Sequence, residues 1–198
     1  MQSDIEIFPI FPSSFCTIML PEMVDKFWEE ETPNIKFFLP DEDASVWQTE
    51  RDVLDNYLEM KELFRQIAED CLKELGYNQK IQITTSWLTA IEHGDTSSFH
   101  RHTNSWYSCV YYFHDSCSDL ILIGNNRRDI DVVVTKGSIH TRNTCTISPQ
   151  KNQFIIFPSY LYHQITKNTF KETRHSLAFN IMPSGKVGHA DSTVNYGE

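Results

Sequence analysis

Residues 99–113 read FHRHTNSWYSCVYYF, two histidines one residue apart followed by an aromatic and β-branched run. Such a run predicts a β-strand, and the histidine pair lies at its mouth. Successive side chains of an extended chain point to opposite faces, so His100 and His102 project the same way. Two imidazoles on one face can bind the same metal ion. The pair therefore predicts half of a metal site, whose third ligand must come from elsewhere in the chain.

Short β-rich runs follow one another through most of the chain after Gly76, and turn residues separate them. They cover residues 81–91, 108–113, 120–123, 130–134, 144–147, 154–157 and 176–181. Seven or eight strands without intervening helices predict an antiparallel sandwich or barrel. We therefore expect a mainly β protein with N-terminal helices.

The N-terminal part of the chain has a helical pattern. From residue 52 to 75 the apolar residues recur with a period near 3.6, which predicts a long amphipathic helix ended by Gly76. A shorter helix is predicted over residues 21–30, residues 5–12 suit an edge strand or an extended lead-in, and the acidic stretch 40–43 suits a solvated loop. The 198 residues are expected to form one domain, with a helical support region over about 1–76 and the β core over about 77–198.

Composition narrows the class of protein. The net charge of −10 disfavours general binding to nucleic acid, which needs clustered Lys and Arg. The five cysteines show no C-x-x-C spacing and suit a reducing compartment. The first twenty residues lack a basic signal-peptide region, and no apolar run approaches the roughly 18 residues of a membrane span. The expected protein is soluble, intracellular and cytoplasmic, without a membrane partner.

Two later segments supply a third metal ligand and a group that can bind a carboxylate. His163 stands at the end of a buried-looking run over residues 153–163 and is the natural third ligand. Alternation along residues 174–180 puts Arg174 and Ser176 on the same face. An arginine facing the interior of a barrel is costly without an anion, and its guanidinium binds a carboxylate through two parallel hydrogen bonds. The sequence therefore predicts metal ligands together with a carboxylate clamp.

This order of parts resembles the Fe(II)/2-oxoglutarate-dependent oxygenases from roughly Trp87 to the C-terminus. Their pattern is H-x-D/E, a distal His on a later strand, and R-x-S about ten residues after that His. Residues 100–102, His163 and residues 174–176 stand at these places. The strand after the histidine pair also resembles that of prolyl-hydroxylase-like members, in which a tyrosine helps to bind the co-substrate. The likeness implies that Tyr112 binds it here.

Three blocks, residues 100–112, 157–163 and 179–188, more narrowly resemble a phage and bacterial branch of the same superfamily. The resemblance implies a double-stranded β-helix, also called a jelly-roll or cupin-like core. It implies Fe(II) as metal, 2-oxoglutarate as co-substrate and molecular oxygen as oxidant. The expected reaction hydroxylates a small-molecule or peptidyl substrate, which the sequence does not identify, and yields succinate and CO2. No catalytic residue is expected beyond the metal site.

One position departs from the family pattern. The usual triad has two histidines and one carboxylate, whereas residue 102 is a histidine. Either His100, His102 and His163 form a neutral three-histidine site, or His102 and Asn104 take the H-x-D places. A three-histidine dioxygenase that does not use 2-oxoglutarate and a non-enzymatic cupin-like binding protein are the alternative functions.

Several aromatic side chains are candidates for a substrate pocket near the metal site. The aromatic residues Trp87, Trp106, Tyr107, Tyr111 and Phe113 could line a substrate pocket, although aromatic strand residues more often pack in a core.

Overall fold

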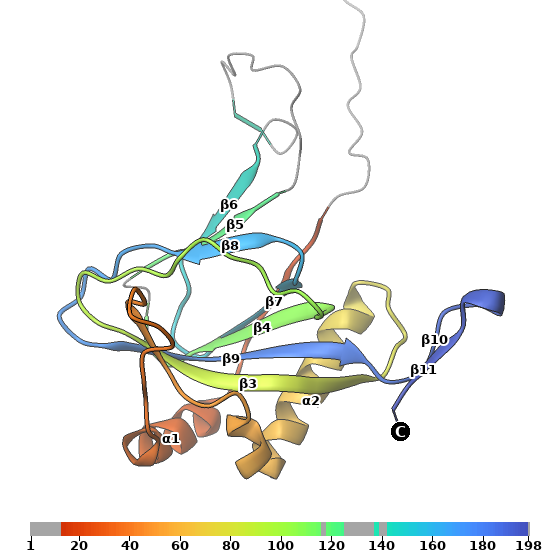
Figure 1. Ribbon diagram of the computed structural model, residues 1–198, viewed down its shortest axis with the longest axis horizontal. Helices are drawn as coiled ribbons and strands as arrows, with labels where there is room; N and C mark the ends of the chain where they lie inside the picture. The colour runs from red at the N-terminus through yellow and green to blue at the C-terminus, as the bar shows by residue number, and fades with distance from the viewer. Residues whose placement is uncertain (1–12, 116–117, 125–136, 139–141, 198) are drawn as a thin grey trace, which may run out of the picture.

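A computed structural model of the chain describes residues 13–115, 118–124, 137–138 and 142–197 (Figure 1). The lead-in predicted at residues 5–12 and the strand predicted at residues 130–134 lie outside the described residues. The other predicted β-runs form strands. Two strands that the sequence pattern did not predict, Cys16–Met19 and Val46–Gln48, lie before residue 77 and pair with them.

Two antiparallel sheets face each other, and together they form a double-stranded β-helix (Figure 1). The major sheet has the order β1-β7-β4-β9-β3-β2, and the minor sheet has the order β6-β5-β8. The strands of the major sheet are β1 (Cys16–Met19), β2 (Val46–Gln48), β3 (Ile81–Ile91), β4 (Tyr107–Tyr112), β7 (Gln153–Pro158) and β9 (Arg174–Pro183). Those of the minor sheet are β5 (Leu120–Ile123), β6 (Thr144–Ile147) and β8 (Tyr162–Ile165), and a C-terminal hairpin joins β10 (Gly185–Val187) to β11 (Val194–Tyr196). This architecture confirms the predicted fold class.

The helices cover the outer face of the major sheet, away from the minor sheet (Figure 1). They are α1 (Glu22–Glu31) and α2 (Leu58–Glu74), with short 3-10 turns at Thr32–Asn34, Val53–Asn56 and Ala190–Ser192. Phe64, Ala68 and Leu72 follow one another at i, i+4 and i+8 on α2, and all three are fully buried against the sheet. Among the described residues no helix is long and apolar enough to cross a membrane.

The long predicted helix is confirmed, but it begins later than its periodicity indicates. Residues 53–56 form a 3-10 turn, and Tyr57 leaves helical geometry before α2 starts at Leu58. The apolar period continues across the break because Val53 and Leu54 are buried by the same core. The helix ends as predicted, since Gly76 has a φ of +92°, a conformation that favours glycine.

His175 faces the helix side of the sheet and gives a first prediction. Its ring contacts Phe37 and lies 6.0 Å from His114, and burial, followed by the charge of His114, lowers its pKa to about 4. In the unfolded chain a histidine has a pKa near 6.5 and takes up a proton more readily than the buried His175 does. The free energy of unfolding therefore falls as the pH is lowered from about 6.5 to about 4. Solvent screening reduces the effect, because the ring is only partly buried.

We expect His175→Leu to weaken the acid sensitivity of folding. Between pH 7 and pH 5 the free energy of unfolding should fall by about 1 kcal/mol more in the parent protein than in the variant. Urea unfolding at the two pH values measures this. An identical pH dependence in both proteins would show that His175 does not titrate differently on unfolding.

Candidate metal centre and its cavity

A cavity of about 880 Å³ opens between the two sheets. Its floor consists of alternate residues of β3 and of residues of β4 and β9, and β5 and β8 close the opposite side. On β9 the lining residues are Ser176, Ala178 and Asn180, which lie on one face of the strand as predicted, together with Phe179. The size suits a site that holds a co-substrate and a small substrate together.

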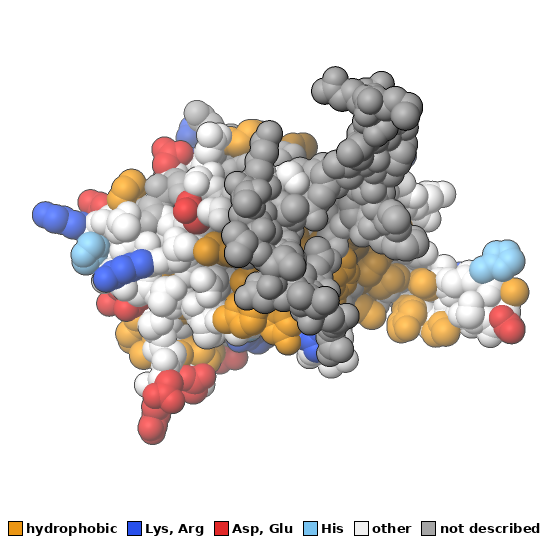
Figure 2. Space-filling view, turned by 90° about the horizontal axis from the view of Figure 1, so that it is seen from above, with side chains coloured by type: hydrophobic (Ala, Val, Ile, Leu, Met, Phe, Trp, Pro, Cys, Tyr) orange, Lys and Arg blue, Asp and Glu red, His pale blue; other side chains and the backbone are white. Residues whose placement is uncertain are grey.

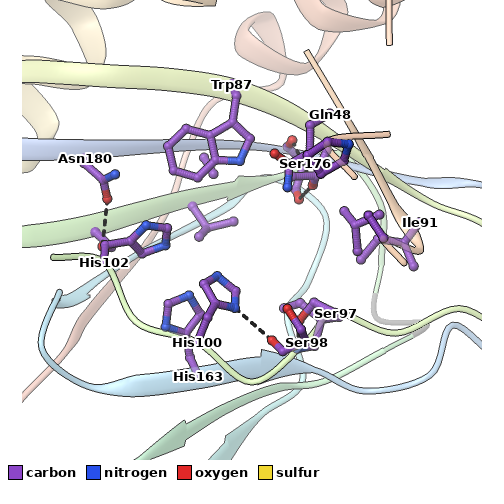
Figure 3. Close-up of a pocket in the computed structure, with 18 of the residues that line it drawn as sticks. Gln48, Trp87, Ile91, Ser97, Ser98, His100, His102, His163, Ser176 and Asn180 are labelled. Atoms are coloured by element: carbon purple, nitrogen blue, oxygen red, sulfur yellow. Dashed lines mark hydrogen bonds between the residues drawn. The ribbon is translucent and has the colours of Figure 1, made fainter. Parts of the chain in front are cut away.

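The three predicted histidines meet in this cavity (Figure 3). One ring nitrogen from each of His100, His102 and His163 lies within 4.8 Å of the other two. The ring centroids are 4.3 Å apart for His100 and His163, 5.1 Å for His102 and His163, and 5.2 Å for His100 and His102. Three imidazoles gathered in this way have the donor chemistry that non-haem iron and other first-row divalent metals prefer.

Backbone pairing brings the histidines together. His100 and His163 exchange two backbone hydrogen bonds of 2.8 and 3.0 Å, and the His102 N–H donates to the Ser159 carbonyl at 3.2 Å. The predicted run over residues 153–163 is in fact two elements, because β7 ends at Pro158 and His163 lies on β8 in the other sheet. The cluster therefore joins β8 to the segment that leads into β4.

The hydrogen bonds of the rings fix which nitrogens are free. The Nδ1–H of His100 donates to the Ser98 carbonyl at 2.8 Å, and that of His163 donates to the Leu161 carbonyl at 3.3 Å. A carbonyl only accepts, so Nδ1 carries the proton in both rings and each Nε2 lone pair is left free. A second hydrogen bond of this kind orients metal-ligating histidines.

Burial keeps two of these rings neutral. It lowers the pKa of His163 to about 3, with further lowering from His100 and His102. Burial likewise lowers the pKa of His102 to about 4, with additional contributions from His100 and Arg51. Near neutral pH both rings are uncharged, which is the form that binds a metal.

The structure does not bring Asn104 to the cluster. Asn104 lies in an exposed turn with a φ of +58°, and it is not among the residues that line the cavity. His102, by contrast, lines the cavity with its ring 5.5 Å from that of Trp87. The arrangement favours the three-histidine alternative over the His102–Asn104 alternative.

A row of polar side chains crosses the sheet at the other end of the cavity. Strand register aligns Gln48 with Thr89, Thr89 with Ser176, and Ser176 with Tyr112. The hydroxyl groups of Thr89 and Ser176 are 2.7 Å apart, and Gln48 lies beside Ser176 (Figure 3). Arg174 is two residues before Ser176 on the same face of β9, and its guanidinium lies 4.9 Å from the Tyr112 ring.

This row contains polar atoms that the described part of the chain leaves without a partner. They are Nη1 and Nη2 of Arg174, the Tyr112 hydroxyl and Oε1 of Gln48. Arg174 is only 3% exposed, and a buried guanidinium without an acceptor is costly. Burial raises the pKa of Tyr112 to about 12, although the charge of Arg174 opposes this shift. An anion placed beside the row would give the guanidinium the acceptor it lacks.

The structure separates the candidate aromatic residues into two groups. Trp87 lines the cavity, whereas Tyr107, Tyr111 and Phe113 belong to the hydrophobic core, and Trp106 packs against it.

Sequence reasoning missed three contributions to the cavity lining. These are Gln48, Arg51 and the acidic loop, from which Asp41 and Asp43 reach the lining. Each comes from a segment with no motif of its own, so only the pairing of β2 with β3 reveals it.

The protein thus combines a double-stranded β-helix, a three-histidine cluster in the cavity between its sheets, and a buried arginine, Arg174, beside the Thr89–Ser176 row, although Arg174 is not itself among the lining residues. Residues 85–180 match the family model described as "Putative 2OG-Fe(II) oxygenase". That model describes a superfamily whose cofactor is Fe(II) and whose co-substrate is 2-oxoglutarate, and the matched residues include the three cluster histidines and Arg174. No curated protein matches the chain.

Solved structures show the same fold at low sequence identity. A 2OG-Fe(II) oxygenase family oxidoreductase from Burkholderia pseudomallei is similar with a TM-score of 0.60 and 11% identity, over 83% of this chain and 84% of that one. HygX from Streptomyces hygroscopicus, solved with nickel and 2-oxoglutarate bound, has a TM-score of 0.60 and 9% identity, over 86% and 83% of the two chains. A prolyl hydroxylase from Trichoplax adhaerens, in complex with a hypoxia inducible factor peptide fragment, has a TM-score of 0.57 and 12% identity, over 85% and 83%.

Proposed function

We propose that this protein is an Fe(II)- and 2-oxoglutarate-dependent oxygenase that hydroxylates a C–H bond of a small-molecule or peptidyl substrate. His100, His102 and His163 hold the iron, and Arg174, Ser176 and Tyr112 bind the far carboxylate of 2-oxoglutarate. The observation that carries the proposal is the pairing of a three-imidazole cluster with a buried guanidinium that has no acceptor among the described residues. Gln48 joins the carboxylate end through the register of β2.

The residues around the cavity do three things for this reaction. When bound, Fe(II) would activate O2, the oxidant, and 2-oxoglutarate would supply two electrons, so that one oxygen atom ends in succinate, with release of CO2, and the other in the hydroxylated substrate. Three neutral imidazoles offset none of the metal's charge, so the site favours an anionic co-substrate. The Arg174 charge and the hydroxyl groups of Ser176 and Tyr112 orient that anion. The indole of Trp87 shields the histidine cluster from water on one side.

Hydrogen bonds beneath the histidines support this geometry. The Ser108 hydroxyl donates to Oδ1 of Asn180 at 2.9 Å, so the Ser159 hydroxyl donates to Ser108 at 2.8 Å. The Asn180 amide in turn donates to Thr85 at 3.0 Å. Because the Ser159 carbonyl accepts from the His102 N–H, this buried chain of bonds holds the His102 segment in place.

Spectroscopy of the iron-loaded protein tests the proposal. Under anaerobic conditions, 2-oxoglutarate added to the Fe(II)-loaded protein should produce a metal-to-ligand charge-transfer band in the visible range. Succinate, which has no keto group, should produce none. On admission of O2, succinate should form from 2-oxoglutarate in proportion to the iron present.

A three-histidine dioxygenase that does not use 2-oxoglutarate is the second candidate, and the all-histidine cluster is the observation that favours it. In that function Arg174 would have no anion to bind, and 2-oxoglutarate would produce no charge-transfer band. A protein that binds iron without a band would therefore contradict the first proposal and support the second.

A further inference from the structure

An arginine that the proposed function does not use, Arg51, lines the cavity, and its backbone is held by the major sheet. Arg51 follows β2 in a segment that runs along β3. The Thr49 N–H donates to the Leu88 carbonyl at 3.1 Å, and the Leu88 N–H donates to Oγ1 of Thr49 at 3.0 Å. The Ser86 N–H then donates to the Arg51 carbonyl at 2.9 Å. These bonds fix the point from which the Arg51 side chain enters the cavity lining.

The guanidinium of Arg51 lies over Trp87, next to the histidine cluster. Its Cζ is 4.6 Å from the centre of the indole, and the same indole is 5.5 Å from the His102 ring. Trp87 is only 5% exposed, so its position is well determined by packing. A cation over an aromatic ring is attracted by the ring face and is thereby held in place.

The N–H donors of Arg51 have no acceptor within the described ranges of the chain. No ion pair or hydrogen bond of its side chain is present there, although Glu50 and Asp52 flank it in the sequence. Partial burial lowers the pKa of Arg51, and Glu50 opposes this change. An arginine remains charged at any ordinary pH. The cavity wall beside His102 therefore carries a fixed positive charge with free donors.

This arginine is separate from Arg174. Along β3, Trp87 contacts Arg51, whereas Ile91 is paired with Arg174 in the strand register. Four residues of strand span about 13 Å, so the two arginines lie beside different parts of β3. Arg174 lies at the end with the Thr89–Ser176 row, and Arg51 lies at the end with the histidine cluster.

We propose that Arg51 and Trp87 form the substrate subsite, and that the substrate is a small molecule or a peptide end with a single carboxylate. The guanidinium binds that carboxylate, and the indole packs against the neighbouring carbon atoms close to the histidine cluster. The assignment of this ligand as the substrate rests on the proposed oxygenase function. The binding of a carboxylate at Arg51 does not depend on that function.

Charge on the cavity lining favours a carboxylate over a phosphate group. Asp41 and Asp43 line the same cavity and are exposed, so they place negative charge on its solvent side. A phosphate monoester carries almost two negative charges near neutral pH and is repelled more strongly than a carboxylate. The planar guanidinium also matches the two oxygens of a carboxylate.

Binding of matched probe pairs tests the proposal without turnover. The probes are N-acetylglycine, N-acetylleucine and hippurate, each with its primary amide, and phenyl phosphate. They are titrated by calorimetry and ligand-observed NMR into full-length Zn(II)-loaded protein, with 2-oxoglutarate saturating so that Arg174 is occupied. At least one carboxylate should bind about tenfold more tightly than its amide. Arg51→Gln should abolish that preference, Arg51→Lys should keep part of it, and Arg142→Gln, at an exposed arginine outside the cavity lining, should leave it unchanged.

The possible results are distinct. Equal binding of every carboxylate and its amide would overturn the proposal, as would a preference that survives in Arg51→Gln. Tighter binding of phenyl phosphate than of every carboxylate would overturn the carboxylate assignment. Thermal unfolding and 2-oxoglutarate affinity should be the same in Arg51→Gln as in the parent. If 2-oxoglutarate does not bind but the carboxylate preference persists in Arg174→Gln and is lost in Arg51→Gln, the oxygenase proposal fails and the subsite stands.

Discussion

Replacing Arg174 with methionine should abolish 2-oxoglutarate binding while leaving the ligand-free protein as stable as before or more so. The guanidinium is buried, and neither Nη atom has a partner among the residues the structure describes. Loss of the charge that pairs with the co-substrate carboxylate should weaken the binding of 2-oxoglutarate at least about 100-fold. Removal of a buried charge that lacks a partner should raise the free energy of unfolding by about 1–2 kcal/mol.

Two measurements decide this prediction. Calorimetric titration of 2-oxoglutarate into Zn(II)-loaded protein gives the affinity, and urea unfolding of the metal-free protein gives the stability. Arg174→Lys is the matched variant, and it should keep part of the affinity because it keeps a charge but loses the planar fork. If Arg174→Met instead unfolded several kcal/mol more easily and bound 2-oxoglutarate normally, the arginine would have a structural role.

Replacing His163 with alanine should remove the metal. His163 is the only one of the three cluster histidines that lies in the minor sheet, and its loss leaves two ligands on one segment. Changes beside a metal ligand already weaken metal binding by roughly 10- to 100-fold, so loss of the ligand itself should exceed this range. Metal content after dialysis, measured by mass spectrometry at pH 7.5, checks the result. Succinate formation should fall to the level of the metal-free protein.

Two other variants make this result specific. His93 is exposed, and its ring hydrogen-bonds to the Phe170 carbonyl outside the cavity lining, so His93→Ala should keep the metal. His102→Asp restores the carboxylate of the usual family pattern and should keep the metal with equal or higher turnover. Loss of metal in His102→Asp but not in His163→Ala would contradict the proposed ligand set.

The two arginines lie beside different parts of β3 and have different expected ligands. Arg174 is buried beside the Thr89–Ser176 row, whereas Arg51 is exposed over Trp87. A buried cation selects one small anion of fixed size, and an exposed one tolerates a larger molecule that extends toward solvent. On the proposed function, we therefore expect the co-substrate at Arg174 and a separate substrate at Arg51.

Local periodicity in the sequence was enough to predict much of the protein. The 3.6-residue pattern before Gly76 predicts α2, and the period of two along residues 174–180 puts Arg174 and Ser176 on the face of β9 that turns out to face the cavity side. His100 and His102 also point to one site, as predicted, although they lie in the irregular segment before β4 and not in a strand. The first two features depend only on how neighbouring residues point, which the backbone geometry of helix and strand dictates.

Only the tertiary structure decided what lies beside these residues. Backbone bonds between His100 and His163 close the histidine cluster, and the turn after Pro158 sends His163 into the opposite sheet. The pairing of β2 with β3 brings Gln48 and Arg51 to the cavity from a segment with no motif. Strand register and sheet order join segments that are distant in the chain, and no local period specifies them. The sequence by itself therefore determined which side chains share a face, and the fold determined which of those faces meet.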